Sequence, residues 1–164
     1  MKKNNVSILG SGWLGLPLAK DLIQQGYPVR ISTRKTEKLV SFEQFGATPY
    51  IVDIDQALFP KAFFESDILI CNITSKNQAG FDKLIEQIAD SQIQHVLFIS
   101  SSSVYHNANA VVTEDSDAED TDNVLFRIEQ TFQSCSHFDT TILRLSGLIG
   151  YQRHPGRLFS NGKV

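Results

Sequence analysis

Short apolar runs alternate with amphipathic stretches along the chain. The runs are long enough for buried strands and too short for core helices, whereas apolar residues spaced three and four apart predict helices. Strands that alternate with helices imply right-handed parallel crossovers, so we predict an α/β fold: a doubly wound parallel β-sheet with helices on both faces. The predicted strands cover residues 6–9, 29–33, 48–52, 68–73, 95–100 and 140–145, and the predicted helices cover 13–25, 35–45, 81–89 and 125–135.

Three glycines come directly after the first predicted strand. Gly10, Gly12 and Gly15 stand in G-x-G-x-x-G spacing where the first predicted helix begins. The first glycine allows a tight turn, the second lets the backbone approach a pyrophosphate, and the third lets the helix pack close to the strand. An ordinary glycine-rich turn is the alternative, but the strand–turn–helix context favours dinucleotide binding on a Rossmann-type sheet. The predicted phosphate-binding residues are Gly10, Ser11, Gly12, Trp13, Leu14 and Gly15.

The end of the second predicted strand indicates which dinucleotide binds. An NAD site usually carries Asp or Glu there, which hydrogen-bonds the ribose 2′-hydroxyl. This chain instead has Thr33, Arg34 and Lys35, which suit a 2′-phosphate. We therefore predict NADP as the cofactor, with NAD as the alternative. If Arg34 and Lys35 only solvate the start of the next helix, this preference would be absent.

Size and composition fit a single NAD(P)-binding Rossmann domain over residues 1–164. The chain is 41% apolar and 20% charged, as in an ordinary globular protein. A net charge of -3 leaves no basic stripe for nucleic acid, and no stretch of about 18 apolar residues would span a membrane. Cys71 and Cys135 lie in apolar settings, which predicts buried thiols in a reducing cytoplasm and no disulfide or metal site.

The segment from Val96 to Tyr105, which reads VLFISSSSVY, narrows the choice of family. It resembles the fifth strand and serine loop of extended and atypical short-chain dehydrogenases/reductases, the NAD(P)-dependent epimerase/dehydratase superfamily. Residues 66–71 resemble the superfamily's fourth strand and residues 143–150 its sixth strand, so the resemblance covers nearly the whole chain. It implies that Asp53 and Ile54 meet the adenine. It also implies that the substrate is a small molecule, either a nucleotide sugar or a carbonyl compound, with a homodimer as the assembly to test.

A second family shares the opening of this chain. Residues 12–19, which read GWLGLPLA, also resemble the start of nucleotide-sugar 6-dehydrogenases. Those enzymes have an acidic residue at the end of the second strand, which this chain lacks. The serine loop favours the short-chain family.

The catalytic residues that the resemblance implies are only partly present. The superfamily uses a Ser or Thr, a Tyr and a Lys, in which the Lys lowers the pKa of the Tyr that exchanges a proton with the substrate. Ser101 matches the family serine, but no tyrosine lies between Tyr105 and Tyr151, and the helix that should carry the Tyr-x-x-x-Lys pair has no lysine. Tyr105 is the remaining substitute.

Two functions follow from this incomplete set. One is an atypical NADP-dependent oxidoreductase or epimerase that uses Ser101 or Tyr105. The alternative is a non-catalytic NADP-binding redox sensor or regulator that acts through a protein partner.

The end of the chain carries a further expectation. Superfamily members generally continue into a small C-terminal substrate domain, and the resemblance implies that this chain lacks it, which would leave an apolar edge exposed. Residues 151–157 resemble the start of the segment that leads into that domain. Arg153, His154 and Arg157 are candidates to meet an anionic substrate, with a solvated basic turn as the alternative.

Overall fold

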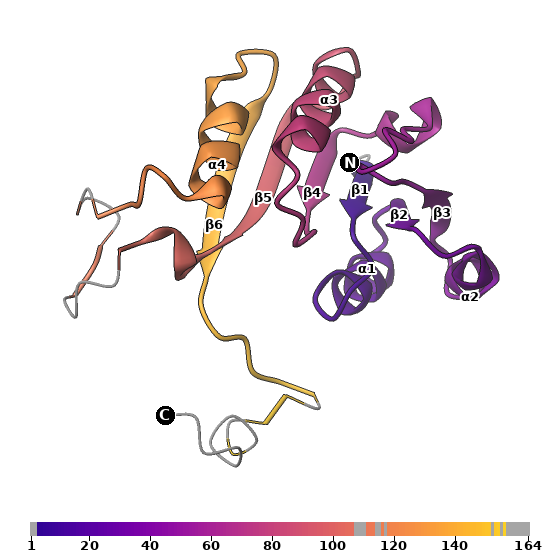
Figure 1. Cartoon of the computed structure of the whole chain (residues 1–164). Helices are drawn as coiled ribbons and strands as arrows, with labels where there is room; N and C mark the ends of the chain where they lie inside the picture. The colour runs from indigo at the N-terminus through magenta and orange to yellow at the C-terminus, as the bar shows by residue number, and fades with distance from the viewer. Residues whose placement is uncertain are drawn as a thin grey trace.

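A single parallel sheet organises the part of the chain that the computed structural model describes, residues 3–106, 111–113, 116, 118–151, 153, 154 and 156. The strand order in this sheet is β3-β2-β1-β4-β5-β6 (Figure 1). The order reverses at β1, which pairs with β2 on one side and with β4 on the other. The strands are β1 (Val6–Leu9), β2 (Val29–Thr33), β3 (Thr48–Ile51), β4 (Ile68–Cys71), β5 (His95–Ser101) and β6 (Asp139–Leu145).

Helices cover both faces of the sheet. Figure 1 shows α3 and α4 on one face, over β4 to β6, and α1 and α2 on the other, near β1 to β3. The predicted doubly wound α/β fold is therefore confirmed. The helices are α1 (Gly15–Gln24), α2 (Leu39–Gln44), α3 (Gln78–Ala89) and α4 (Val124–Ser134), with 3-10 turns η1 (Thr36–Lys38), η2 (Lys61–Phe64) and η3 (Ser102–Val104).

The core consists of one apolar cluster on each face. Under α3 and α4, Phe98 stacks on Phe132 with ring centroids 4.8 Å apart, and Phe81 meets both rings edge-on. Under α1 and α2, the fully buried Ile8 and Ile31 pack with Ala19 and Phe42. Burial of these side chains provides most of the favourable free energy of folding and holds the strand ends in register.

Several boundaries differ from those predicted. The first helix begins at Gly15 because Trp13 and Leu14 belong to the preceding turn. The second predicted helix is divided into η1 and α2. Helix α3 begins three residues early, because the Asn77 side chain caps it by accepting a hydrogen bond from the Gly80 N–H at 3.1 Å. The connection over 57–65, where neither a strand nor a helix was predicted, contains η2, whose phenylalanines are buried.

The two cysteines lie in different environments. Cys71 is fully buried in β4, and burial raises the pKa of its thiol to about 12. The prediction that Cys135 is buried was wrong, because this residue follows α4 and is partly exposed, with its Sγ 3.8 Å from His137 Nδ1. Both are free thiols. In the described ranges, no helix has the length and apolar character needed to span a membrane.

Candidate functional site

The glycine turn lies at the point where the strand order reverses. Gly10 has φ +105°, and a Cβ at this position would lie 2.3 Å from the carbonyl oxygen of Asn72. A Cβ at Gly15 would lie 1.9 Å from the carbonyl oxygen of Gly10, whereas a Cβ at Gly12 would meet nothing within 4 Å. Gly10 and Gly15 are thus required by the packing of the turn, and Gly12 faces open space where a ligand can approach the backbone.

The turn is tied to β2 and leaves the start of α1 free. The Gly10 N–H donates a hydrogen bond to Ser32 Oγ at 2.8 Å. No side chain caps α1 at its N-terminus. The Leu16 N–H already donates to the Gly12 carbonyl at 3.1 Å, and Pro17 has no N–H. The Gly15 N–H and the positive end of the dipole of this ten-residue helix therefore remain available for phosphate oxygens.

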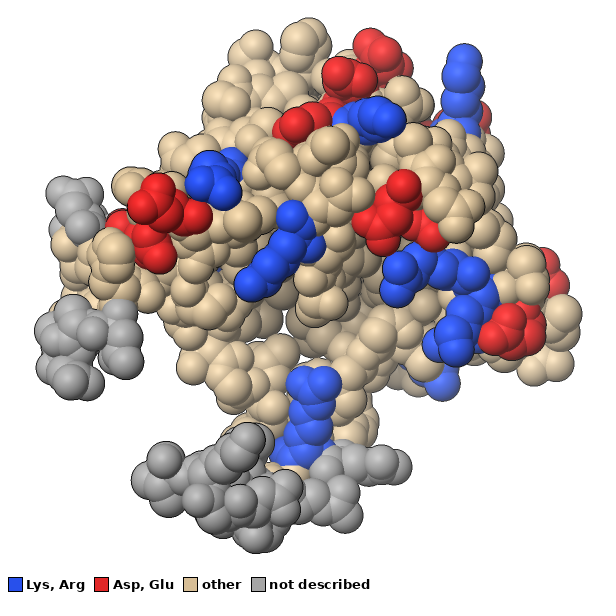
Figure 2. Space-filling view, in the orientation of Figure 1, with Lys and Arg blue, Asp and Glu red and all other residues tan. Residues whose placement is uncertain are grey.

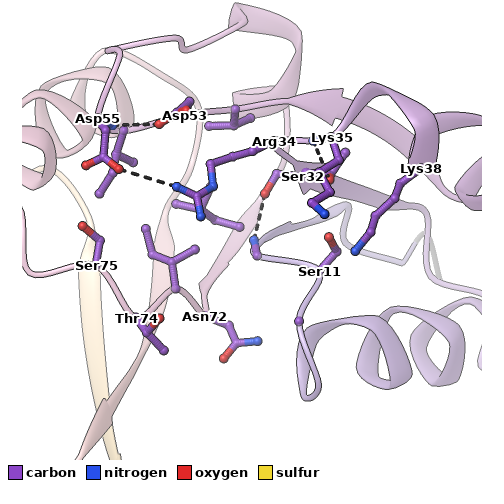
Figure 3. Close-up of a pocket in the computed structure, with 17 residues that line it drawn as sticks. Ser11, Ser32, Arg34, Lys35, Lys38, Asp53, Asp55, Asn72, Thr74 and Ser75 are labelled. Atoms are coloured by element: carbon purple, nitrogen blue, oxygen red, sulfur yellow. Dashed lines mark hydrogen bonds and ion pairs between the residues drawn. The ribbon is translucent and has the colours of Figure 1, made fainter.

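A first cavity of about 460 Å³ opens beside this turn (Figure 3). Its wall comes from the turn, the ends of β2 and β3, η1 and the segment after β4. Eight of the predicted cofactor-binding residues line it: Gly10, Ser11, Gly12, Thr33, Arg34, Lys35, Asp53 and Ile54. Trp13 and Leu14 line the neighbouring cavity instead. The structure therefore brings the β2 end and the Asp53–Ile54 pair to one side of the glycine turn, as a bound adenosine would require.

The charged residues of the first cavity point in two directions. Arg34 Nη1 lies 3.6 Å from Asp55 Oδ2, with both side chains largely exposed. Asp55 is held in turn by Asn77, whose Nδ2 donates to Asp55 Oδ1 at 2.8 Å. Figure 3 shows Lys35 and Lys38 pointing the other way, toward Ser11. Two ammonium groups without an ion pair among the described residues thus lie on the Ser11 side of the cavity.

The sequence interpretation missed six polar residues of this wall: Ser32, Lys38, Asp55, Asn72, Thr74 and Ser75. Lys38 follows Lys35 by about one helical turn, so the predicted helix contained the signal. Asn72 directly follows β4, and the carboxyl ends of parallel strands are where ligands bind in open α/β sheets. That rule alone would have identified the segment after β4.

A second cavity of about 480 Å³ continues from the first. The two share Gly12 and residues 72–75, so they form one groove along the carboxyl ends of the strands. Figure 2 shows the surface hollowed between the sheet and the segment after β6. Ser101 lies on the wall of the second cavity, with its Oγ accepting a hydrogen bond from the Ser103 N–H at 3.1 Å.

Helix α4 contributes an aliphatic side chain to the second cavity. Leu125 lies on the wall. The charged residues of the wall are Lys76 and Arg153, and no Asp or Glu lines the described part of the cavity. No tyrosine lines that part either, and most of the remaining side chains are apolar or carry hydroxyl groups.

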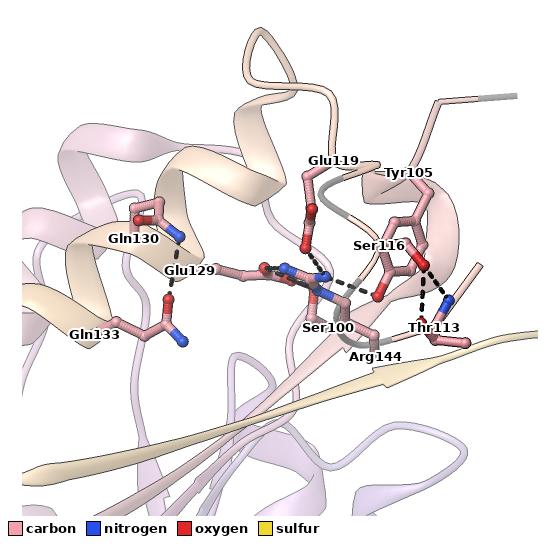
Figure 4. A network of polar contacts seen from close by, with 9 residues as sticks. All are labelled: Ser100, Tyr105, Thr113, Ser116, Glu119, Glu129, Gln130, Gln133 and Arg144. Carbon is pink, nitrogen blue, oxygen red and sulfur yellow. Dashed lines mark hydrogen bonds and ion pairs between the residues drawn. The ribbon is translucent and has the colours of Figure 1, made fainter. Parts of the chain in front are cut away.

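Tyr105 lies outside this wall, in a polar network around Arg144 (Figure 4). Arg144 Nη1 donates to the Tyr105 hydroxyl at 2.8 Å and to Glu119 Oε1. Arg144 also donates from Nη2 and Nε to Glu129 Oε2, at 2.7 and 3.1 Å. Ser100 Oγ donates to Glu129 Oε1 from the other side. The Tyr105 hydroxyl thus helps to attach the loop that follows β5 to strand β6.

Charge pairing makes this network strong. The Glu129 side chain is completely buried, and its carboxylate receives two donors from one guanidinium, a geometry that compensates for lost hydration. Burial alone lowers the pKa of Arg144, but the hydrogen bonds to Glu129, Glu119 and Tyr105 outweigh it and raise that pKa. The hydrogen bond from Arg144 lowers the pKa of Glu119. Arg144 interrupts an apolar strand, which was the one sequence signal for this network.

The remaining predicted residues of the C-terminal segment are only partly described. The Arg153 guanidinium lies over the Trp13 ring, 4.4 Å from its centroid. His154 is exposed, and its Nδ1 accepts a hydrogen bond from the Gly156 N–H. Arg157 lies outside the described residues. Leu143 of the edge strand β6 is 43% exposed.

The groove fits a nicotinamide dinucleotide. Open space at Gly12 and an uncapped helix terminus suit the diphosphate, and a cavity lies on either side of them for the two nucleoside halves. When bound, such a cofactor supplies hydride transfer. The chain's own residues position it and shape the second cavity for a further ligand.

Comparisons with known proteins agree with this geometry. A family model described as NAD(P)H-binding matches residues 10–163. Protein YeeZ of Escherichia coli strain K12 is 30% identical over 176 residues, covering 98% of this chain and 64% of YeeZ. UDP-glucose-4-epimerase of Stenotrophomonas maltophila, solved with bound NAD, has a TM-score of 0.70 at 17% identity, covering 87% of this chain and 52% of that one. Yeast methylglyoxal/isovaleraldehyde reductase Gre2, solved with NADPH, has a TM-score of 0.71 at 16% identity, covering 87% and 55%.

These matches differ in what they show. The two solved structures are less than 25% identical to this chain and show that it shares their fold. The chain spans 64% of YeeZ and about half of each solved structure. The family match extends over most of the chain and confirms the predicted cofactor class. The glycine turn, the groove and this match together place the chain in the NAD(P)H-binding family.

Proposed function

We propose that the chain binds NADP(H) in preference to NAD(H), with the adenosine half in the first cavity and the nicotinamide half in the second. The observation that supports this proposal is the continuous groove on both sides of Gly12. Lys35 and Lys38 supply positive charge on the ribose side, and no acid stands at the end of β2 to accept a 2′-hydroxyl. A 2′-phosphate would bind these ammonium groups through charge-assisted hydrogen bonds.

Arg34 has a different part in this proposal. Its guanidinium is turned toward Asp55, at the mouth of the first cavity. It lies there with Asp53 and Ile54, the residues expected to meet the adenine. An arginine at this place can stack on the base while its charge stays near the 2′-phosphate. We therefore assign the direct phosphate contact to the lysines and the adenine contact to Arg34.

We further propose that the chain is the cofactor-binding part of an atypical oxidoreductase or epimerase. Ser101 Oγ accepts from the Ser103 N–H, so its own proton is free to donate to a substrate oxygen in the second cavity. Ser101 is then the residue that orients a carbonyl or sugar hydroxyl beside the nicotinamide. Tyr105 would have to leave the Arg144 network before it acted on a substrate. The solved neighbours with NADPH and NAD are a reductase and an epimerase, which supports these reaction classes.

A second candidate function is a non-catalytic NADP-binding regulator. It is favoured by the absence of a Tyr-x-x-x-Lys pair from a chain that keeps the glycine turn, because the family's lysine lowers the pKa of the tyrosine that transfers the proton. Such a module would bind the cofactor without turnover and change its affinity for a protein partner with the cofactor's redox state.

A titration tests the cofactor proposal, because Trp13 is the only tryptophan and lies at the groove. We expect NADPH to quench Trp13 emission and to bind at least roughly tenfold more tightly than NADH, about 1.4 kcal/mol. Equal affinities would contradict the NADP preference, and the absence of binding by both fluorescence and calorimetry would contradict the cofactor site.

Turnover distinguishes the two functions. The enzyme proposal predicts NADPH oxidation with carbonyl compounds or conversion of nucleotide sugars, and loss of that activity in Ser101→Ala with NADPH affinity unchanged. Tight NADPH binding without turnover on a broad panel would favour the regulator. A partner that binds equally well with and without cofactor would then contradict the regulator as well.

A further inference from the structure

We propose that the second cavity carries an anion site formed by Lys76 and Arg153, which takes a phosphate or carboxylate group. The inference rests on the proposed function for the place of the nicotinamide, and it specifies the chemistry of the ligand beside it. Arg153 and Lys76 are the two charged side chains on this wall, and no carboxylate lines its described part. Net positive charge at a partly apolar cavity favours an anionic ligand.

The backbone around Arg153 holds this residue at the cavity. Gly150 and Arg153 exchange two backbone hydrogen bonds, 3.1 Å from the Gly150 N–H and 2.8 Å from the Arg153 N–H. Gly150 has φ +137°, and Tyr151, the first residue between the two bonded ends, has φ 47°. The turn follows β6, and Figure 1 shows the chain leaving the sheet there at the carboxyl edge. These two backbone hydrogen bonds hold the Arg153 backbone in place, whatever the charge on its side chain.

The Arg153 side chain is positioned by Trp13. The guanidinium lies over the indole, 4.4 Å from the ring centroid, and Tyr151 meets the same indole edge-on at 6.1 Å. A guanidinium stacked on a ring keeps its N–H donors in the plane, where they can bind a planar carboxylate or two phosphate oxygens. In the described ranges no acidic side chain forms an ion pair with Arg153, in contrast to Arg34 and Arg144. Its donors are therefore available to a ligand.

Lys76 comes from a different element of the same wall. It follows Ser75 in the segment after β4, and its side chain is exposed. A lysine ammonium on a flexible stem adjusts to the position of an anion that the arginine has fixed. Hydroxyl and amide groups complete the polar lining, among them Asn72, Ser101 and Ser146. A ligand with an anionic group and a carbonyl or hydroxyl fits this combination.

Two sources could supply the anion. One is the diphosphate of the cofactor, since Trp13 belongs to the glycine turn; the other is an anionic group on the second substrate. The chemistry of recognition is the same for both. A titration with inorganic phosphate as the probe separates them, carried out first on the protein alone and then on the protein saturated with NADP⁺. Potassium chloride at matched ionic strength controls for screening.

We expect phosphate to change Trp13 emission and to give a calorimetric signal. Arg153→Gln and Lys76→Gln should each weaken phosphate binding by roughly tenfold, the effect of losing one charge-assisted hydrogen bond. Lys83→Gln on α3 and Arg127→Gln on α4 are matched controls, since both residues are exposed and lie outside the cavity. Calorimetry is needed beside fluorescence because Arg153→Gln also alters the surroundings of Trp13.

The outcomes decide whether the anion site exists and which molecule supplies the anion. Phosphate binding that persists in the NADP⁺-saturated protein supports an anionic second substrate, and binding that disappears there supports the cofactor diphosphate. Unchanged phosphate affinity in both Arg153→Gln and Lys76→Gln, or no phosphate binding in the native protein, would overturn the inference. The measurement on cofactor-free protein is independent of the NADPH titration, so this failure is distinguishable from failure of the proposed function.

Discussion

The two halves of the groove are built in different ways. The half around the first cavity depends on backbone: a glycine turn, an uncapped helix terminus and strand ends, with exposed lysines beside them. The half around the second cavity depends on side chains from β5, α4 and β6, which a buried network around Arg144 holds together. The first half brings the glycine turn and the ends of β2 and β3 to one cavity. In the second half, the charged side chains of the network join β6 to α4 and to the loop after β5.

This contrast shows where sequence change is tolerated in such a domain. Backbone contacts to a diphosphate depend on a few glycines, and any Cβ at Gly10 or Gly15 collides with a carbonyl group. Proton-transfer residues depend on side chains alone, so they can be replaced without loss of the fold. A domain of this kind can therefore keep its cofactor site while its proton-transfer residues change.

The largest effect is expected from breaking the network of the second half. Arg144→Met leaves the buried Glu129 carboxylate without its bidentate partner, and we expect it to lower the free energy of unfolding by about 3–5 kcal/mol. Urea unfolding measures this change. Arg127→Met on the exposed face of α4 is the control, with an expected change within about 0.5 kcal/mol. Similar stability of the two variants would show that the network contributes little.

The glycine turn of the first half gives the next effect. A Cβ at Gly15 would overlap the Gly10 carbonyl, so Gly15→Ala should cost about 1–3 kcal/mol of stability and abolish NADPH binding. A Cβ at Gly12 meets nothing within 4 Å, so Gly12→Ala should leave stability unchanged. It should weaken NADPH binding roughly tenfold or more, because the methyl group would occupy the diphosphate approach. Thermal unfolding and calorimetry distinguish the two; equal loss of stability in both would contradict the open groove.

A smaller effect tests the cofactor preference. Lys38→Gln removes one ammonium from the ribose side, and we expect the ratio of NADPH to NADH affinity to fall by roughly tenfold, about 1.4 kcal/mol. NADH affinity should stay the same, because NADH has no 2′-phosphate. Lys61→Gln in η2 is the control, since this lysine lies outside both cavities. A fall in affinity for both cofactors alike would point to a structural role for Lys38.

The smallest effect concerns acid stability. The Arg144 hydrogen bond lowers the pKa of Glu119 in the folded protein. Such a group stabilises the fold fully above its pKa in the unfolded chain, near 4.5, and this contribution disappears as the pH falls through the lowered folded value. Glu119→Gln should therefore be less stable than the native protein at pH 7, by no more than about 1 kcal/mol, and the difference should shrink in acid.

Urea unfolding from pH 7 downward measures this difference. Glu86→Gln on the exposed face of α3 is the matched control, and we expect it to follow the native curve more closely. A difference between Glu119→Gln and the native protein that stays constant into acid would show that the Glu119 charge does not stabilise the fold.

Local patterns were enough to predict the fold and the glycine turn. Apolar runs and helical spacing identified the strands and helices, because burial on a sheet face requires those periods. The glycine spacing identified the turn between β1 and α1, because Gly10 and Gly15 are required by backbone packing within a few residues. Boundaries were less accurate where a cap decided them, as at Asn77, and the environment of Cys135 depended on where α4 ended.

The second half could not be derived in this way, for a physical reason. The sequence by itself determined the alternation of strands and helices, the glycine turn and the absence of a Tyr-x-x-x-Lys pair. Only the tertiary structure decided that Tyr105 faces Arg144, that Glu129 is buried beside it, and that Arg153 returns to Trp13. Backbone requirements act between near neighbours in the chain, whereas these side-chain contacts join residues 15 to 140 positions apart through the packing of the sheet.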